Sequence, residues 1–205
     1  MTPGLVFYEG GELSKQRRLL PKSEDRSCYV VVSQAPLSKW KQFHRGEFPV
    51  VELEDLPDLF RGAFPVRIGS YGDPTAVPVE VWRGVLEHQV CWTGYTSQWR
   101  REEYQEYKDF LMASVSDPVE MQEAHQLGWR TFRIGRKNEP LIAGVEIICP
   151  ATPEGGFRTQ CDSCNLCMGR ARSGAKSIVT APHGTGAKYH EKRGEDLRPN
   201  VWGRR

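Results

Sequence analysis

The sequence has no apolar run that approaches the roughly 20 residues a membrane-spanning helix needs. Its first residues, MTPGLVFYEGGELSK, lack the basic start and the apolar stretch of a secretory signal. Both absences argue against a membrane protein and against an exported one. We therefore expect a reducing cytosolic setting, where clustered cysteines bind metal or do redox chemistry more often than they form disulfides.

Several catalytic signatures are also missing. The chain has no Gly-rich phosphate loop of the P-loop or Rossmann type, no G-x-S-x-G nucleophile elbow and no H-E-x-x-H motif. A function has to be sought in less common arrangements of residues.

The composition is that of a globular protein. The 205 residues are 39% hydrophobic and 10% aromatic, and a mean hydropathy of −0.56 predicts extended or loosely packed ends. We expect an irregular arm over residues 1–27, an α/β domain over 28–155, and a Cys-rich, basic segment over 156–205 that packs on this domain. The last segment carries ten Lys/Arg and four Asp/Glu, a net +6, against 18 and 22, a net −4, in the rest of the chain.

Apolar, β-branched runs alternate with helical patterns along the chain, which is typical of parallel βα units. The polar stretch 97–109 is one expected helix, and the helix after Ser116 has clear signals, with Asp117 as cap, Glu120 completing a capping box and Gly128 at the end. The expected strands are CYVVVS (28–33), VRIGS (66–70), VCWTG (90–94), FLMASV (110–115), TFRIG (131–135) and GVEIIC (144–149).

Six such units predict a partial or distorted TIM-like (βα)6 barrel, with a doubly wound open sheet as the alternative. The connection between the last two strands is too short for a full helix, so these two strands are alternatively a hairpin. A further short strand, Ser177–Thr180, follows the cysteines.

Ligands of parallel α/β sheets gather at the carboxyl ends of the strands. Three side chains there are candidate catalytic groups: Asp73 in a long Gly-containing loop, Tyr95 after the strand at 90–94, and Arg133 at the end of 131–135. Arg136 is a candidate ligand-binding group beside Arg133. Asp117 also follows a strand, and we assign it to helix capping.

The stretch CDSCNLCMG (161–169) holds three cysteines at successive x2 spacings, and Cys149 precedes it by eleven intervening residues. Tetrahedral zinc sites usually join two separated CxxC pairs, whereas a C-x2-C-x2-C run with a remote fourth cysteine is typical of iron–sulfur ligation. We predict that Cys149, Cys161, Cys164 and Cys167 bind a [4Fe-4S] cluster, with Zn²⁺ and free or disulfide-forming thiols as the alternatives. Cys28 and Cys91 lie in apolar strands and are assigned to core packing.

The segment after the cysteines, SIVTAPHGTGAKYHEKR (177–193), places His183 in a Gly-containing turn, where it is a candidate ligand-binding residue. The basic side chains of the C-terminal quarter are candidates for phosphate contacts. They are Arg158, Arg170, Arg172, Lys176, Lys188, Lys192 and Arg193.

Five stretches between residues 66 and 188, VRIGSYGDPTAVP, WTGYTSQW, ICPAT, CDSCNLCMG and SIVTAPHGTGAK, resemble an uncharacterised family of bacteriophage and prophage proteins. The resemblance implies a phage-type origin and the cytoplasm of a bacterial host cell, but no activity. The six-strand layout is also similar to the partial barrels of radical S-adenosylmethionine enzymes. Those enzymes carry C-x3-C-x2-C after the first strand, whereas the cysteines here come late and have a different spacing.

Two functions remain open at this point. The first is an iron–sulfur protein with a small-molecule or nucleotide pocket at the strand ends, where the cluster does redox or radical-type chemistry. The second is a nucleic-acid-binding or partner-binding protein without catalysis, in which a metal staples the basic C-terminal segment. The sequence does not decide whether the chain is an enzyme.

Overall fold

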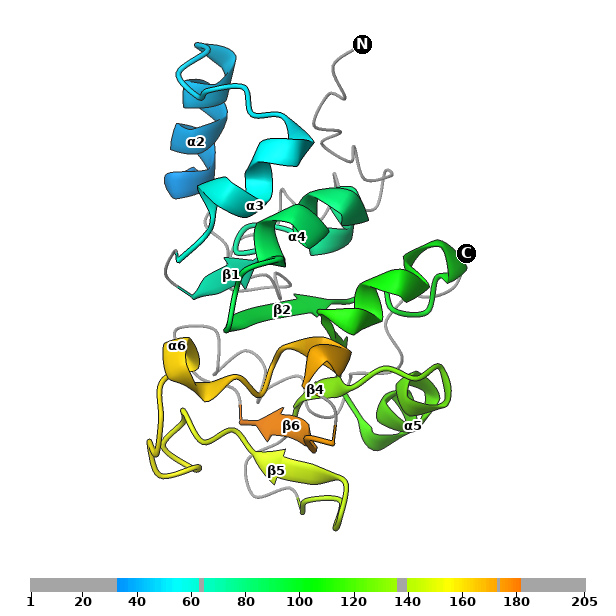
Figure 1. The fold of residues 1–205 in the computed structure, drawn as a ribbon. Helices are drawn as coiled ribbons and strands as arrows, with labels where there is room; N and C mark the ends of the chain where they lie inside the picture. Colours follow the sequence, from blue (N-terminus) through cyan, green and yellow to red (C-terminus); the bar gives the residue numbers. More distant parts are fainter. Residues whose placement is uncertain (1–32, 63–64, 136–139, 173, 182–205) are drawn as a thin grey trace. The chain divides into compact units, whose positions relative to one another are not determined.

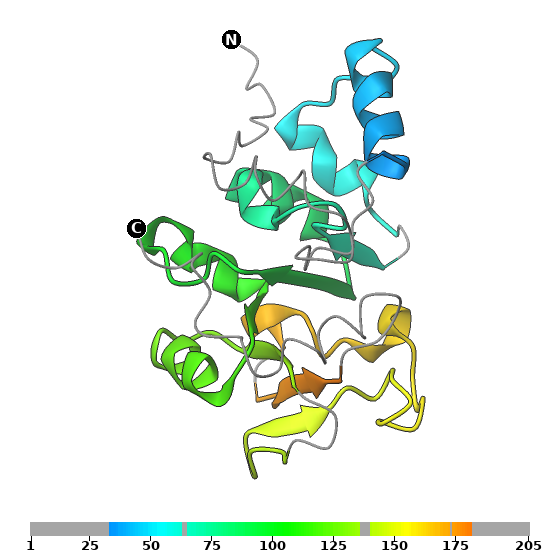
Figure 2. The ribbon, with the colours of Figure 1, turned by 180° about the vertical axis from the view of Figure 1, so that it is seen from behind.

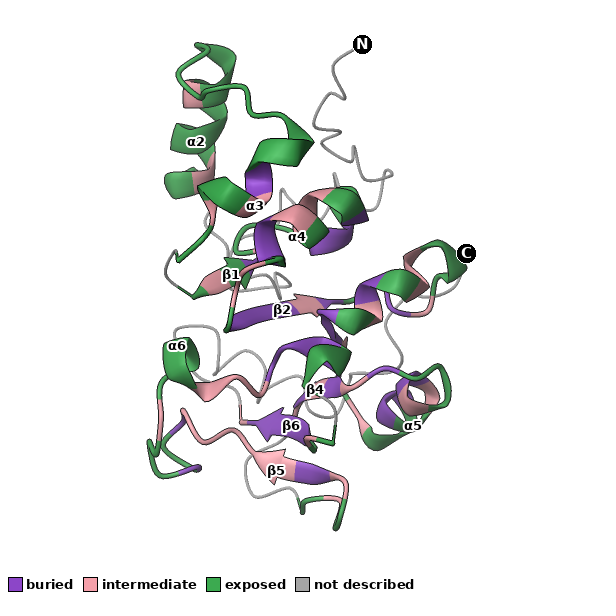
Figure 3. Ribbon diagram, in the orientation of Figure 1, coloured by how far each residue is buried: buried purple, intermediate pink, exposed green. Residues whose placement is uncertain are grey.

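A computed structural model describes residues 33–62, 65–135, 140–172 and 174–181. The chain divides into two compact units, and the boundary between their described parts lies after Val50. The first unit contributes the helix α2 (Ala35–His44), which has no buried residue (Figure 3). The second unit contains the sheet and the described cysteines, which are Cys91, Cys149, Cys161, Cys164 and Cys167. None of the helices in the described residues is both long and apolar enough to cross a membrane.

A six-stranded, wholly parallel sheet forms the centre of the second unit (Figure 1). Because both faces of such a sheet are covered, its strands are short apolar runs, as the sequence predicts. Six expected strands are confirmed within a few residues, Ser177–Thr180 with the predicted bounds, whereas the one at 28–33 lies almost wholly outside the described residues. The strands are β1 (Val66–Ile68), β2 (Trp92–Thr96), β3 (Met112–Val115), β4 (Thr131–Ile134), β5 (Glu146–Ile148) and β6 (Ser177–Thr180).

The order of the strands is β1-β2-β3-β4-β6-β5, and the sheet is not closed. The expected TIM-like barrel is therefore not confirmed, and an open α/β sheet is what the described residues form. The hairpin alternative for the last two expected strands is wrong, because β6 lies between β4 and β5 and pairs in parallel with both. The chain thus reverses its direction of travel across the sheet after β5.

This reversal decides on which face the cysteines lie. Parallel crossovers are almost always right-handed, so a chain that turns back along the sheet places its connection on the opposite face. The helix α5 (Pro118–Gln126), from the β3–β4 connection, covers one face, which we call the helix face. The β5–β6 connection carries α6 (Cys161–Cys164), and α5 and α6 lie on opposite sides of the strands in both views (Figures 1 and 2).

The helix face holds the larger core. There α4 (Val79–Leu86) and the 3-10 helix η3 (Glu102–Asp109) pack against the strands. The 3-10 helix η3 takes the place of the helix expected at 97–109. The short helices η1 (Leu53–Asp55) and α3 (Leu56–Leu59) pack on α4. Two further 3-10 turns, η2 (Pro74–Ala76) and η4 (Gly169–Ala171), lie in loops.

The predicted start of α5 is confirmed in its main feature. The Asp117 carboxylate accepts a hydrogen bond from the backbone N–H of Glu120 at 2.9 Å, as an N-cap does. The Glu120 carboxylate accepts from the N–H of Ser116 at 2.8 Å, one residue before the position that a regular capping box uses. Asp117 is thus a structural residue.

Candidate metal centre

The cysteines of the β5–β6 connection lie on the face of the sheet that carries no long helix, which we call the cysteine face. Residues of five strands contribute to it, because side chains of one parity along each strand share a face. Met112, Cys167 and Ile178 are buried together there, and further side chains pack against them: Tyr95, Phe132, Ile147, Cys149 and Leu166. The structure thus brings Cys149 and Cys167 to one apolar surface, as the sequence predicts for two ligands of one centre.

The local backbone of the cysteine motif follows from its sequence. Cys161–Cys164 form a single helical turn, which ends at Asn165 in the left-handed conformation with φ 58°. Asn adopts this conformation more readily than most residues, so the helical turn ends here and the chain changes direction without strain. The turn itself is largely exposed (Figure 3), whereas Cys167, just beyond it, is buried against the sheet.

The thiols lie close enough to affect one another electrostatically. Burial, with smaller contributions from the nearby Cys149, Cys164 and Cys161, raises the pKa of the Cys167 thiol to about 12. Tyr95 packs against the same apolar cluster, and its hydroxyl opposes this rise in pKa. Burial, with smaller contributions from Cys161 and Cys164, also raises the pKa of Cys149. Tyr95 is therefore placed beside the cysteines, as expected, and touches one of them.

Cys149, Cys161 and Cys164 lie near Cys167. In the described part of the chain, no three His, Cys, Asp or Glu side chains are arranged to hold a single metal ion. A tetrahedral zinc site draws four sulfurs to about 2.3 Å from one point. A four-iron cluster instead carries its thiolates at the corners of a larger body, so its ligands stand further apart. The donor set consists of sulfur alone, which suits zinc or iron–sulfur and not Mg²⁺ or Ca²⁺.

A fifth cysteine, Cys91, belongs to the same region. It immediately precedes β2, it is buried, and its sulfur lies 3.7 Å from the carbonyl oxygen of Cys161. The sequence analysis assigned Cys91 to core packing alone and missed this contact. No local pattern connects residues separated by 70 positions, and an additional cysteine in a chain with a metal motif was the one available signal.

Asp73 joins two loops at the carboxyl edge of the sheet. One carboxylate oxygen accepts hydrogen bonds from the Thr75 N–H at 3.1 Å, the Thr75 hydroxyl at 2.9 Å and the Thr96 hydroxyl at 2.8 Å. The other oxygen accepts from the Ser97 N–H at 2.9 Å and the Ser97 hydroxyl at 3.2 Å. The carboxylate is thus engaged by protein groups on both oxygens, which supports a structural role, and the catalytic role stays a prediction.

We expect Asp73→Ala to destabilise the fold by about 1–3 kcal/mol, because the Ser97 N–H and the Thr96 hydroxyl lose their acceptor. Urea denaturation measures the change. Asp58→Ala is the matched control, since Asp58 is 81% exposed and pairs with Arg61 alone, and it should change stability little. An Asp73 variant as stable as the control would contradict the structural role.

Arg133 lies on the helix face and not with the cysteines. Its side chain is fully buried and donates to Glu146 through two hydrogen bonds, Nε to Oε1 at 2.7 Å and Nη2 to Oε2 at 2.8 Å. Neighbouring residues of a strand point to opposite faces, so Phe132 faces the cysteines and Arg133 does not. The structure therefore does not bring Arg133 into the proposed site. Arg136 and His183 lie outside the described residues.

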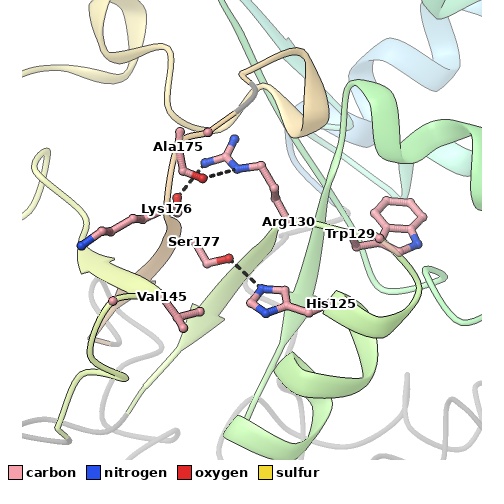
Figure 4. Close-up of a pocket in the computed structure, with 10 residues that line it drawn as sticks. His125, Trp129, Arg130, Val145, Ala175, Lys176 and Ser177 are labelled. Atoms are coloured by element: carbon pink, nitrogen blue, oxygen red, sulfur yellow. Dashed lines mark hydrogen bonds between the residues drawn. The ribbon is translucent and has the colours of Figure 1, made fainter.

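A hollow of about 440 Å³ lies at the amino ends of β4, β5 and β6, opposite the carboxyl edge (Figure 4). The Arg130 guanidinium tethers the end of the β5–β6 connection there, donating to the carbonyls of Ala175 at 3.0 Å, Gly169 at 2.8 Å and Lys176 at 2.7 Å. Ser177 accepts from the Thr131 N–H at 3.1 Å. These contacts fix the segment that carries the cysteines to the sheet.

His125 points from α5 toward Ser177 in the same hollow, with its Nε2 2.9 Å from the Ser177 hydroxyl (Figure 4). Burial lowers the pKa of His125 below its ordinary value of 6.5, although nearby Glu146 opposes the shift. The fold therefore favours the neutral ring. The unfolded chain binds the proton more readily. The stability that the neutral ring contributes is therefore fully present above the pKa of His125 in the unfolded chain, and it is lost as the pH falls below that pKa.

We expect the free energy of unfolding to decrease between about pH 7 and pH 5 in the parent, and to decrease less in His125→Gln. Urea denaturation at several pH values measures how steeply the free energy of unfolding changes with pH in the parent and in the variant. Equal slopes would show that His125 does not couple folding to protonation.

Comparisons of this chain with protein-family models, with curated proteins and with solved structures find no match.

Proposed function

We propose that this chain is an iron–sulfur protein whose cluster is held by Cys149, Cys161, Cys164 and Cys167 on the cysteine face of the sheet. The observation that carries the proposal is that the β5–β6 connection brings Cys149 and Cys167 to one apolar cluster and keeps Cys161 and Cys164 close to them. The C-x2-C-x2-C spacing with a remote fourth cysteine supports a cluster over a single zinc ion.

The surroundings suit one-electron chemistry. A cluster with a cysteine on every iron has no coordination position left for a substrate, so redox exchange is what it supplies when bound. The potential of such a cluster depends on hydrogen bonds to its sulfurs and on exposure. Tyr95 packs beside Cys167, and Cys161 is exposed to solvent, which gives an electron a short route to a partner.

The nucleic-acid alternative draws less support from the described residues. The Arg158 Nε donates to the Gly155 carbonyl at 3.0 Å, and an Arg170 Nη lies 3.6 Å from the Asp109 carboxylate. Both side chains are thus engaged within the protein. Lys188, Lys192 and Arg193 lie outside the described residues.

Anaerobic purification tests the proposal directly. We expect a brown protein with about four irons and four sulfides per chain, and a paramagnetic signal on reduction by one electron. Cys164→Ala and Cys167→Ala should lose the iron, whereas Cys28→Ala, which removes a cysteine outside the motif, should keep it. A colourless protein with one zinc per chain would overturn the cluster in favour of a zinc site.

A further inference from the structure

The sequence spaces the three cysteines of the motif equally, but the structure makes the two intervals different. Cys161 and Cys164 belong to the same helical turn, α6. Asn165, in the left-handed conformation, then changes the direction of the chain, and Cys167 lies beyond it. The first interval is therefore helical and the second is not, so the two neighbouring pairs of thiols have different geometries.

The helical pair is close to the geometry of a disulfide. Side chains three residues apart in a helix lie on one side of it, with Cβ atoms about 5–6 Å apart. A disulfide needs about 3.5–4.5 Å between these atoms, so a shift of about 1–2 Å would let Cys161 and Cys164 bond. The exposed turn can make this shift, since its hydrogen bonds are local: the Ser163 hydroxyl donates to the Gln160 carbonyl at 3.3 Å and to the Asp162 carboxylate at 3.2 Å.

The exposure of the thiols decides which one an external oxidant reaches first. Cys161 is exposed and Cys164 is partly buried, whereas Cys167 is 8% exposed and packs against Met112 and Ile178. Thiol–disulfide exchange depends on the access of the attacking sulfur. An exposed cysteine that reacts first, followed three residues later by a more sheltered one that completes the exchange, is the arrangement of C-x-x-C redox motifs.

We propose that Cys161 and Cys164 form a redox pair in the cluster-free chain and exchange with low-molecular-weight disulfides. The Cys161 thiolate attacks one sulfur of the external disulfide, which releases one external thiolate and leaves a mixed disulfide on Cys161. The Cys164 thiolate then attacks the Cys161 sulfur and releases the second external thiolate. The pair gives up two protons and two electrons, and the external disulfide becomes two thiols. Excess thiol reverses both steps.

This activity goes beyond the proposed function, in which the same two thiols bind the cluster. Because the thiolate is the form of cysteine that binds a metal, a sulfur in a disulfide is not available to iron. The disulfide and the cluster therefore exclude each other. The reduced chain accepts a cluster and the oxidised chain does not.

The first test uses the unmutated, full-length chain, purified with a chelator and a reductant, freed of both, and treated with oxidised glutathione. We expect it to lose two of its six thiols, through a disulfide between Cys161 and Cys164. Cleavage before Asp162 and after Leu166 separates the three cysteines of the motif, so mass spectrometry of the linked peptides identifies the pair. A disulfide that includes Cys167 instead would overturn the inference.

The second test removes the thiol that completes the exchange. Cys164→Ala should keep glutathione on Cys161, at least about ten-fold more per chain than the parent, since an attack within one molecule is strongly favoured over one from solution. Cys91→Ala is the matched control: the Cys91 sulfur lies 3.7 Å from the Cys161 carbonyl oxygen, which makes it the rival partner. This control should form the disulfide as the parent does, and circular dichroism checks that both variants are folded. Equal glutathione on Cys164→Ala and on the parent would contradict the inference.

The outcomes separate the redox pair from the iron–sulfur function. A chain that binds iron but forms no disulfide between Cys161 and Cys164 would refute the pair and leave the proposed function intact. A chain that forms this disulfide but never holds iron would support the pair and refute the proposed function. If both occur, the oxidised chain should take up at least about ten-fold less iron than the reduced one, because losing two ligands costs no less than losing an outer partner of a ligand. Equal uptake would show that the disulfide and the cluster do not compete, against the inference.

Discussion

Glu146→Gln should destabilise the protein by about 3–5 kcal/mol, one of the largest effects of any single substitution in the described residues. Removing the charge takes from the fully buried Arg133 guanidinium the carboxylate that accepts two of its hydrogen bonds, and breaking a buried ion pair is costly. The pair is strongly coupled in the fold: burial would raise the pKa of Glu146, yet the hydrogen bonds and charge of Arg133 hold this pKa below its usual value. Urea denaturation measures the loss.

The matched control is Glu106→Gln. Its pair with Arg83 has a similar distance, 2.8 Å, but both side chains are about half exposed. Exposed pairs contribute about 0–1 kcal/mol, so this variant should be nearly as stable as the parent. The double variant Arg133→Met/Glu146→Leu removes both charges, and we expect it to be more stable than Glu146→Gln. A loss below about 1 kcal/mol in Glu146→Gln would show that water reaches the pair.

The strands were predictable because most are short, largely apolar runs that are buried on both faces; β1, with its exposed Arg67, is the exception. The order of the last two was not. This order depends on whether β5 pairs directly with β4 or leaves room for β6 between them. The segment between β4 and β5 carries no sequence signal that distinguishes these two positions. The reversal matters for function, because it places the β5–β6 connection, with its cysteines, on the face opposite α5.

The candidate site was predictable to the extent that spacing reveals it. The run from Cys161 to Cys167 and the nearby Cys149 were recognisable in the sequence, and the structure gathers them. Arg133 was predicted as a candidate from its place at a strand end, but the face to which its side chain points depends on one residue of register, and strand ends are uncertain by more than that. Cys91 required the tertiary contact with Cys161, which no local pattern contains.

Gly169→Ala is the second substitution with a large expected effect, and it bears on the cysteines directly. Gly169 follows Cys167 by two residues and has a φ of +56°, which an L side chain adopts at a cost of about 1–2 kcal/mol. A Cβ there would lie 2.6 Å from the backbone nitrogen of Leu111 and 2.7 Å from its carbonyl oxygen. Because Leu111 leads into β3, these atoms cannot move aside without disturbing the sheet.

Overpacking of this kind adds about 1–3 kcal/mol, so we expect Gly169→Ala to lose at least about 3 kcal/mol in all. Gly174→Ala is the control, because Gly174 also has a positive φ, +75°, but a Cβ there meets no atom within 4 Å. It should lose only the conformational cost of about 1–2 kcal/mol. Denaturation curves of the two variants separate close packing from backbone conformation, and equal losses would show that the approach to Leu111 is not tight. Under the proposed function, the displaced segment in Gly169→Ala should also release iron faster than Gly174→Ala does, since Cys167 is held in place by the same contact.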